Sequence, residues 1–281
     1  MRIALAITGA WFLLELAGGL YTNSLALLAD AAHMLTDVAA LGLSLFAVKI
    51  AARPATHQKT YGYLRAEILA ALANGVFLVL ISLYICYEAY ERFSAPPEVK
   101  SIPMLVVAGS GLIANLATAA LLYGSQHDSL NLRGAFLHVV GDTLGSVGAI
   151  AAGIAMVAWH WYLADPIASV LVSVLVLYSA WQLVRESVDV LLEAVPSHIS
   201  IPAILADLGS VHGVLSVHDL HVWSITSGMP AMSCHVVLRP GFEDPGVLEE
   251  LSRLMREKYG IEHTTIQIEG QSLILPRSEV R

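Results

Sequence analysis

The sequence predicts an α-helical membrane protein with six transmembrane helices followed by a small cytoplasmic α+β domain. Of its 281 residues, 56% are hydrophobic and 14% are charged, a balance typical of proteins embedded in lipid. Apolar runs of about 18 residues or more, enough to cross a bilayer as a helix, recur as far as Val184 and then stop. We therefore expect a six-span transmembrane domain at residues 1–190 and a cytoplasmic domain at 191–281.

Six apolar runs define the expected spans. The first lacks the basic start, short apolar core and small-residue cleavage site of a removable signal, so we expect it to be retained as a span. The expected spans are residues 3–20, 24–50, 66–87, 102–123, 135–158 and 166–184.

Basic residues in the short loops predict the orientation, because Lys and Arg stay on the cytoplasmic side during insertion. This predicts a multi-pass protein of the cell (inner) membrane with both termini cytoplasmic. The net charge of −8 argues against nucleic acid as a partner. On the cytoplasmic side of the six-span arrangement lie Arg2, Lys49, Arg53, Lys59, Arg65, Arg133 and Arg185, and on the other side Arg92 and Lys100.

The pattern changes after Pro196. Residues 201–211 form an amphipathic helical pattern, and residues 214–228 and 231–238 alternate and are rich in β-branched residues, as strands do. Residues 244–260 follow as a helix, with Asp244 as a possible N-cap and Gly260 just past the end, and 263–269 as a final strand. The order α-β-β-α-β predicts a ferredoxin-like or metallochaperone-like domain, with helices on one face of an antiparallel or mixed sheet.

Two of the apolar spans carry the same pair of ionisable residues. His33 and Asp37 are spaced i, i+4 in the second span, and His138 and Asp142 repeat that spacing in the fifth. One such pair is equally well explained as a core hydrogen bond that offsets burial. Because each ionisable group at membrane depth costs about 3 kcal/mol or more, two copies favour a functional site. Two imidazoles and two carboxylates suit a tetrahedral Zn²⁺, with Co²⁺ or Cd²⁺ as alternatives.

Several motifs together are similar to those of a known family. The chain resembles the cation diffusion facilitators, six-span efflux carriers for zinc and related ions, and is close to their bacterial zinc–cobalt–cadmium members. The motifs that carry the resemblance are "SLALLADAAHMLTD", "KTYGYLRAE", "DSLNLRGAFLHVVGD" and "HDLHVW" followed by "TIQIE". The resemblance spans nearly the whole chain. It implies that His33, Asp37, His138 and Asp142 form the transport site, and that the protein is a homodimer that exchanges metal for protons by alternating access.

A second set of candidate ligands lies in the cytoplasmic domain. His218 and His235 fall on adjacent expected strands, and His263 and Glu269 fall on the last one. The resemblance implies that these positions bind a regulatory metal, Zn²⁺, at the dimer interface. The alternative is a set of surface histidines that bind nothing specific.

Three further residues are weaker candidates. Asp30 lies one turn before His33 and is either an acceptor that orients the imidazole or a group near the wet end of the helix. His57 stands alone in the loop "RPATHQKTYGY", and His221 is as well explained by packing beside Trp223 as by metal binding.

We therefore expect a carrier that exports Zn²⁺ through the bilayer in exchange for protons. Alternatives from other classes are a membrane metal sensor or metal-binding protein without net transport, and an intramembrane metalloenzyme. The sequence contains no HExxH motif and no candidate general base beside the metal ligands. We therefore expect no catalytic residues, which disfavours the metalloenzyme. A channel is disfavoured because a closed four-ligand cage binds too tightly for conduction.

Overall fold

The computed structural model describes residues 2–51, 56–123, 130–241 and 245–270, with backbone alone in parts of the helices. The chain divides into two compact units. The first, the helical unit, comprises Met1–Ala52 and Ala70–Arg185, and the second, the α/β unit, comprises Arg53–Leu69 and Glu186–Arg281. The expected boundary between residues 190 and 191 stays a prediction.

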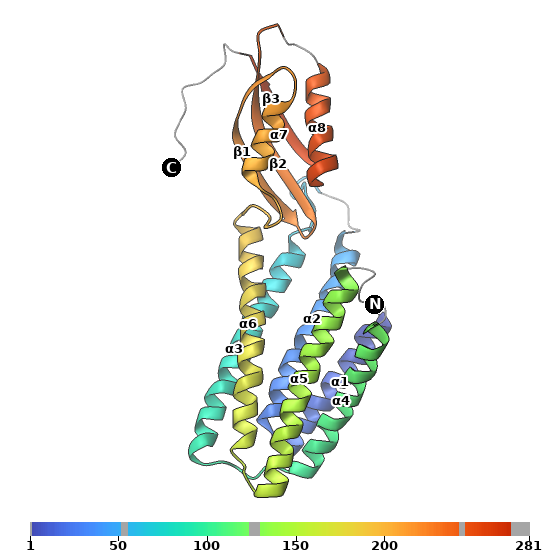
Figure 1. The fold of residues 1–281 in the computed structure, drawn as a ribbon, viewed down its shortest axis with the longest axis vertical. Coiled ribbons are helices and arrows are strands. Elements are labelled where there is room, and N and C mark those ends of the chain that lie inside the picture. The colour runs from blue at the N-terminus through green and yellow to red at the C-terminus, as the bar shows by residue number, and fades with distance from the viewer. Residues whose placement is uncertain (1, 52–55, 124–129, 242–244, 271–281) are drawn as a thin grey trace. The chain divides into compact units, whose positions relative to one another are not determined.

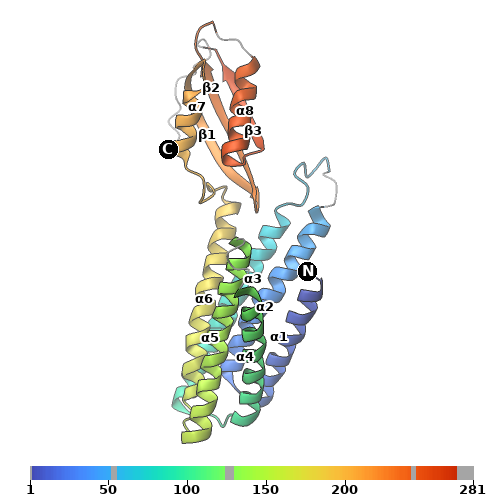
Figure 2. The same ribbon diagram turned by 45° about the vertical axis from the view of Figure 1, so that its right-hand side comes forward.

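Six long helices build the helical unit, one at each of the six apolar runs (Figure 1). Helix α1 contacts α2 and α4, and α5 contacts α2 and α4, while α3 and α6 lie side by side (Figure 2). Several helices run beyond their apolar stretch, because a helix continues as polar turns where it leaves the apolar layer. Their bounds are α1 Arg2–Thr22, α2 Leu25–Ala51, α3 Ala66–Ser94, α4 Ser101–Tyr123, α5 Leu130–Trp159 and α6 Ala164–Leu191.

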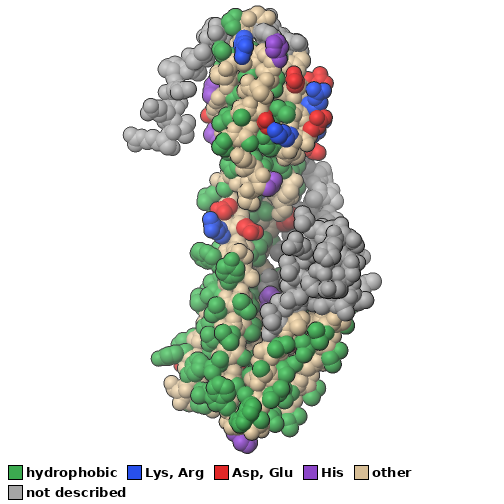
Figure 3. All heavy atoms as spheres, in the orientation of Figure 1, with side chains coloured by type: hydrophobic (Ala, Val, Ile, Leu, Met, Phe, Trp, Pro, Cys, Tyr) green, Lys and Arg blue, Asp and Glu red, His purple; other side chains and the backbone are tan. Residues whose placement is uncertain are grey.

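The outer surface of this unit is apolar. Large side chains such as Leu13, Phe77 and Leu171 are more than half exposed, and hydrophobic side chains dominate the helical unit in the space-filling view (Figure 3). Counting only described residues, α1, α3 and α6 are long and apolar enough to cross a membrane, and shorter apolar stretches lie in α2, α4 and α5. Membrane crossing by all six helices stays a prediction.

Glycines bring neighbouring helices close. A Cβ on Gly19 would lie 2.8 Å from Leu28 Cδ2, and one on Gly75 would lie 2.9 Å from Val184 Cγ2. Such contacts let helix backbones approach where there is no hydrophobic driving force between helices in lipid. The α1–α2 and α3–α6 pairs are therefore packed through these positions.

The α/β unit has the expected order α-β-β-α-β. Strand β2 is central, pairs antiparallel with β1 and parallel with β3, so the sheet is mixed. Val222 of β1 and Cys234 and Val236 of β2 share one core with Leu208 of α7 and Leu251 of α8, which places both helices on one face of the sheet. The bounds are α7 Ile201–Ser210, β1 Val214–Thr226, β2 Met229–Leu238, α8 Pro245–Tyr259 and β3 His263–Glu269.

The expected ends of α8 are largely confirmed. The helix begins at Pro245, and the possible N-cap Asp244 lies outside the described residues. At the other end Gly260 has a φ of +66°, and the amide of Ile261 donates to the Met255 carbonyl at 3.1 Å. The Gly260 amide also donates to the Arg256 carbonyl at 3.1 Å, the bond of an αL helix end, which requires the left-handed conformation that glycine adopts at no steric cost.

Candidate functional site

In the helical unit, α2 and α5 bring one imidazole and one carboxylate together. His33 Nε2 lies 2.9 Å from Asp142 Oδ1. Both side chains are mostly buried, with exposed fractions of 23% and 18%. A histidine and an aspartate from two apolar helices can share a proton or bind one metal ion in the same place.

The other two members of the expected transport site lie on the same two helices. Asp37 is one turn after His33 on α2, and His138 is one turn before Asp142 on α5. Residues four apart share a helix face, so Asp37 is on the same face of α2 as His33 and His138 is on the same face of α5 as Asp142. Their side chains lie outside the described residues, and the four-ligand set stays a prediction.

Asp165 fixes the start of the helix that carries His33. It is fully buried at the first turn of α6 and accepts hydrogen bonds from the amides of Leu25 at 2.8 Å and Ala26 at 3.3 Å. A carboxylate at these amides caps the N-terminus of α2 and complements its dipole. The cap sits about two turns before His33 and so sets the position of the imidazole along the helix.

Asp30 lies between the same two helices. Its side chain is 7% exposed, and its Oδ1 is 3.1 Å from the position that a Cβ on Gly145 of α5 would take. Because glycine has no side chain, Gly145 leaves room for the Asp30 carboxylate against α5, next to the turn that carries Asp142. The placement fits an acceptor close to the site, and its role stays a prediction.

The α/β unit contains a second cluster on the sheet face opposite the helices. Glu269 Oε2 lies 3.1 Å from His218 Nε2, and Glu269 Oε1 lies 2.9 Å from His235 Nδ1. One potential ligand atom from each of these three residues falls within 4.8 Å of the others. Two imidazoles and a carboxylate at that spacing are a suitable donor set for Zn²⁺.

A β-bulge in β1 lets this face carry both histidines of "HDLH". His218 pairs with His235 and His221 pairs with Ser233, so three steps on β1 match two on β2. Asp219, inside the irregularity, has a φ of +51°. Without the extra residue, side chains three apart would point to opposite faces.

His263 is not brought into the cluster. It pairs with Ala231 at the start of β3, whereas His235 pairs with Gln267. Four residues of strand separate these positions, about 13 Å. Gln267 is the neighbour that sequence reasoning missed, and its amide donates to Glu269 Oε1 at 2.9 Å. The i, i+2 spacing of Gln267 and Glu269 on one strand was the available signal.

The remaining candidates are exposed. His221 Nε2 lies 3.1 Å from Asp219 Oδ1, and Asp219 Oδ2 lies 3.8 Å from His235 Nε2, so His221 borders the cluster. His57 is exposed in the turn between Thr56 and Lys59, and among the described residues it belongs to no group of three or more potential metal ligands.

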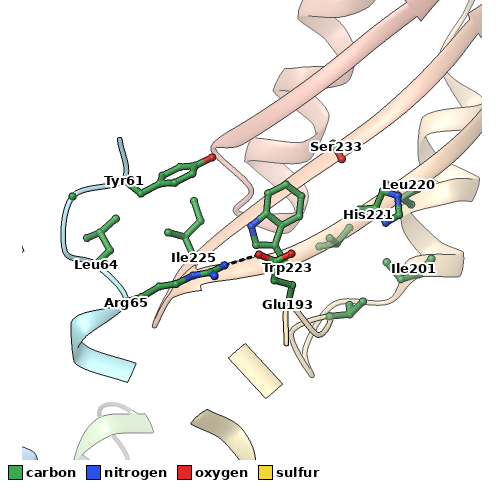
Figure 4. A pocket seen from close by; sticks show the side chains of 13 residues that line it. Tyr61, Leu64, Arg65, Glu193, Ile201, Leu220, His221, Trp223, Ile225 and Ser233 are labelled. Carbon is green, nitrogen blue, oxygen red and sulfur yellow. Dashed lines mark hydrogen bonds and ion pairs between the residues drawn. The ribbon is translucent and has the colours of Figure 1, made fainter. Parts of the chain in front are cut away.

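A cavity of about 690 Å³ lies beside this face within the α/β unit (Figure 4). Arg65 and Glu193 form an ion pair of 2.9 Å across it, and Trp223 and His221 belong to its lining. Of the predicted ligands only His221 lines the cavity, so this space is separate from the three-residue cluster.

Cys234 is excluded as a ligand by its position. It stands next to His235 but points to the opposite face, into the helix-covered core. Burial raises the pKa of its thiol to about 11, so the thiolate that binds metals is not formed near neutral pH.

Comparison with family models covers both units. Residues 1–192 match the model of the cation efflux transmembrane domain. Residues 196–271 match the model of the cation efflux protein cytoplasmic domain. Together these two matches account for nearly the whole chain.

Individual proteins show the same likeness. A "Cadmium, cobalt and zinc/H(+)-K(+) antiporter" of Bacillus velezensis is 47% identical, over 94% of this chain and 85% of its own. The "Zinc transporter ZitB" of Pectobacterium atrosepticum is 45% identical, over 95% of this chain and 84% of its own. A solved structure of the metal-bound C-terminal domain of the CzcD transporter from Cupriavidus metallidurans is 35% identical, over 25% of this chain and 99% of its own, with a TM-score of 0.25.

Proposed function

The chain belongs to the cation diffusion facilitator family of cation efflux transporters, and from that membership we propose that it exports Zn²⁺ from the cytoplasm in exchange for protons. It is a membrane-embedded transporter and not an enzyme. Two similar proteins are named as zinc transporters or antiporters for cadmium, cobalt and zinc, so Cd²⁺ and Co²⁺ are the further candidate cargoes.

The observation that carries this proposal is the His33–Asp142 pair. It joins two helices at 2.9 Å inside an apolar bundle, and each helix carries a further ionisable residue four positions away, a repetition that favours a functional site at membrane depth. Zn²⁺ entering between the two side chains is bound by a neutral imidazole and a carboxylate. Asp37 and His138, on the adjacent turns, complete a tetrahedral set in this proposal.

Protons compete with the metal for the same atoms. A ligand must lose its proton before it binds Zn²⁺, and an imidazole does so near physiological pH. Protonation from the outside therefore releases the ion outward. Rocking of helices about a midplane site exposes it alternately to the two sides, which makes metal release and proton uptake one coupled event.

The cytoplasmic cluster is proposed as a second zinc site. Its donor set, His218, His235 and Glu269, is already assembled, and the remaining coordination position is open to water or to a second copy of the chain. We propose that the protein is a homodimer and that metal at this site promotes transport when cytosolic zinc rises. In the proposed orientation, with both termini in the cytoplasm, the cluster lies on the side where zinc is collected.

The same cluster supports the second candidate function, a membrane metal sensor without net transport. A sensor would bind zinc at both sites and move none. Flux separates the two functions, because only a carrier changes the metal content of a closed vesicle.

The test is Zn²⁺ movement into proteoliposomes under an imposed pH gradient, with internal pH recorded at the same time. We expect the wild-type chain to move zinc one way and protons the other, and Asp142→Ala to abolish both. Glu91→Ala, a change to an exposed carboxylate at the end of α3, is the control that keeps full flux. Zinc that binds without crossing would establish the sensor instead.

A further inference from the structure

Glu15 is a buried carboxyl group that the metal pair does not use. It lies on α1 with 2% of its surface exposed. Its Oε1 accepts a hydrogen bond from the indole Nε1 of Trp11 at 3.0 Å. Its Oε2 is buried and has no hydrogen-bond partner among the described residues. Buried polar atoms are nearly always paired, so an orphan carboxylate oxygen indicates a ligand.

The group sits where α1, α4 and α5 meet. A Cβ on Gly111 of α4 would lie 3.0 Å from Glu15 Oε1 and 3.6 Å from Ser146 Oγ of α5, so the bare glycine backbone makes room for the carboxyl group. Ser146 is buried as well, and Asn115 Nδ2 donates to its hydroxyl at 3.5 Å. The result is a small polar region inside an apolar bundle, one turn from Asp142.

Among the described residues, the ionisable groups near Glu15 are two carboxylates and the imidazole bonded to one of them. Asp30 of α2 and Asp142 of α5 are the carboxylates that interact electrostatically with Glu15, and His33 of α2 is bonded to Asp142. Helix α4 contributes no acidic or basic residue. No described Lys or Arg is hydrogen-bonded or ion-paired to the Glu15 carboxylate.

We propose that Glu15 binds a proton that the chain carries in the direction opposite to the metal, beside the metal site rather than within it. A metal cation of the K⁺ or Ca²⁺ kind needs several oxygen ligands at once, whereas a proton needs one free lone pair. The orphan Oε2 offers that one position. Neutralising the carboxylate also removes the cost of burying an unpaired charge.

Coupling to the metal follows from charge alone. When Zn²⁺ binds between His33 and Asp142, its two positive charges favour the carboxylate form of Glu15, and the carboxylic acid gives its proton to water on the open side. When Zn²⁺ leaves, the carboxylate takes up a proton from the other side. This inference rests on the proposed exchange and adds to it a proton that no metal ligand carries.

The test counts the protons released per Zn²⁺ bound, by titration calorimetry of the full-length protein in detergent, in buffers of different ionisation enthalpy. We expect Glu15→Gln to bind zinc and to release about one proton fewer than wild type, and Glu15→Asp, which keeps a carboxyl group, to release the wild-type number. Glu91→Gln is the matched exposed control with no change. The cytoplasmic cluster is present in all four proteins, so its contribution cancels.

An unchanged proton count in Glu15→Gln would overturn the proposal. If that variant does not fold, infrared difference spectra of the wild type on zinc binding take its place. Loss of a protonated-carboxyl band on zinc binding, at a frequency that is different in Glu15→Asp, supports the proposal. Absence of such a loss overturns it. Failure of the exchange function is a separate result, because it would appear as zinc that binds to the wild type without zinc or proton movement in proteoliposomes, whatever Glu15 does.

Discussion

Glu269 is the residue that organises the cytoplasmic cluster. It is buried, with 6% of its surface exposed, while the two imidazoles that it contacts are more accessible. Each of its oxygens faces a different histidine, so the carboxylate fixes both rings before any metal arrives. Ligands that are held in place by the fold lose little freedom on binding, which favours affinity.

Replacing this carboxylate should weaken metal binding strongly. We expect Glu269→Gln to lower the Zn²⁺ affinity of the cytoplasmic site at least about tenfold, the lower end of the effect of losing a supporting group near a metal. Competition with a zinc-sensitive dye measures it, in an Asp142→Ala background to silence the proposed transport site. His263→Ala should leave the affinity unchanged, because His263 lies about 13 Å along the sheet. A loss in both variants would show that His263 binds as well.

The sequence predicts that histidines and a carboxylate form this cluster, but it does not predict which of the candidate histidines belong to it. Adjacent strands and alternating side chains are enough to bring His218, His235 and Glu269 to one face. The register is what excludes His263, and register depends on the bulge at Asp219 and on the parallel pairing of β3. Neither leaves a clear mark in the sequence, since a bulge residue need not be a glycine.

At the scale of elements, Asp207 ties the two helices of the α/β unit together. The carboxylate of this α7 residue accepts from Lys258 Nζ of α8 at 2.6 Å and from the hydroxyl of Tyr259. The Lys258 hydrogen bond, helped by that of Tyr259, lowers the pKa of Asp207. Burial and the Asp207 carboxylate raise the pKa of Tyr259 to about 12, so the phenol stays a donor throughout the neutral range.

Asp207 should therefore stabilise the unit in a pH-dependent way. A carboxylate whose pKa is lower in the folded state stabilises it above the unfolded value of about 3.9, and the gain is lost as pH falls through the folded value. We expect Asp207→Asn to lower the midpoint of thermal unfolding at neutral pH, and the difference from wild type to shrink as pH falls below about 3.9. Glu257→Gln, an exposed change on the same helix, is the control. A difference that does not depend on pH would contradict this origin.

Helices are predicted from the sequence more reliably than their ends or their partners. Apolar runs locate all six long helices, yet α3 continues to Ser94 and α6 to Leu191, because hydropathy reports the apolar layer and not the hydrogen bonds of the next polar turns. Residues 53–69 belong to the α/β unit, where Arg65 pairs with Glu193. Pairs so distant in sequence leave no periodic signal.

At the scale of the whole molecule, the untested prediction is that all six helices cross the membrane, with both termini in the cytoplasm. Thr56 and Glu98 are exposed residues in two different loops, and the single expected span between them, α3, puts them on opposite sides. In a background with Cys86→Ser and Cys234→Ala, we expect a membrane-impermeant maleimide to label Glu98→Cys in intact cells and Thr56→Cys only after permeabilisation. The cysteine-free background controls for other targets. Labelling of both variants from outside would reject the six-span arrangement and, with it, the cytoplasmic collection of zinc by the His218–His235–Glu269 cluster.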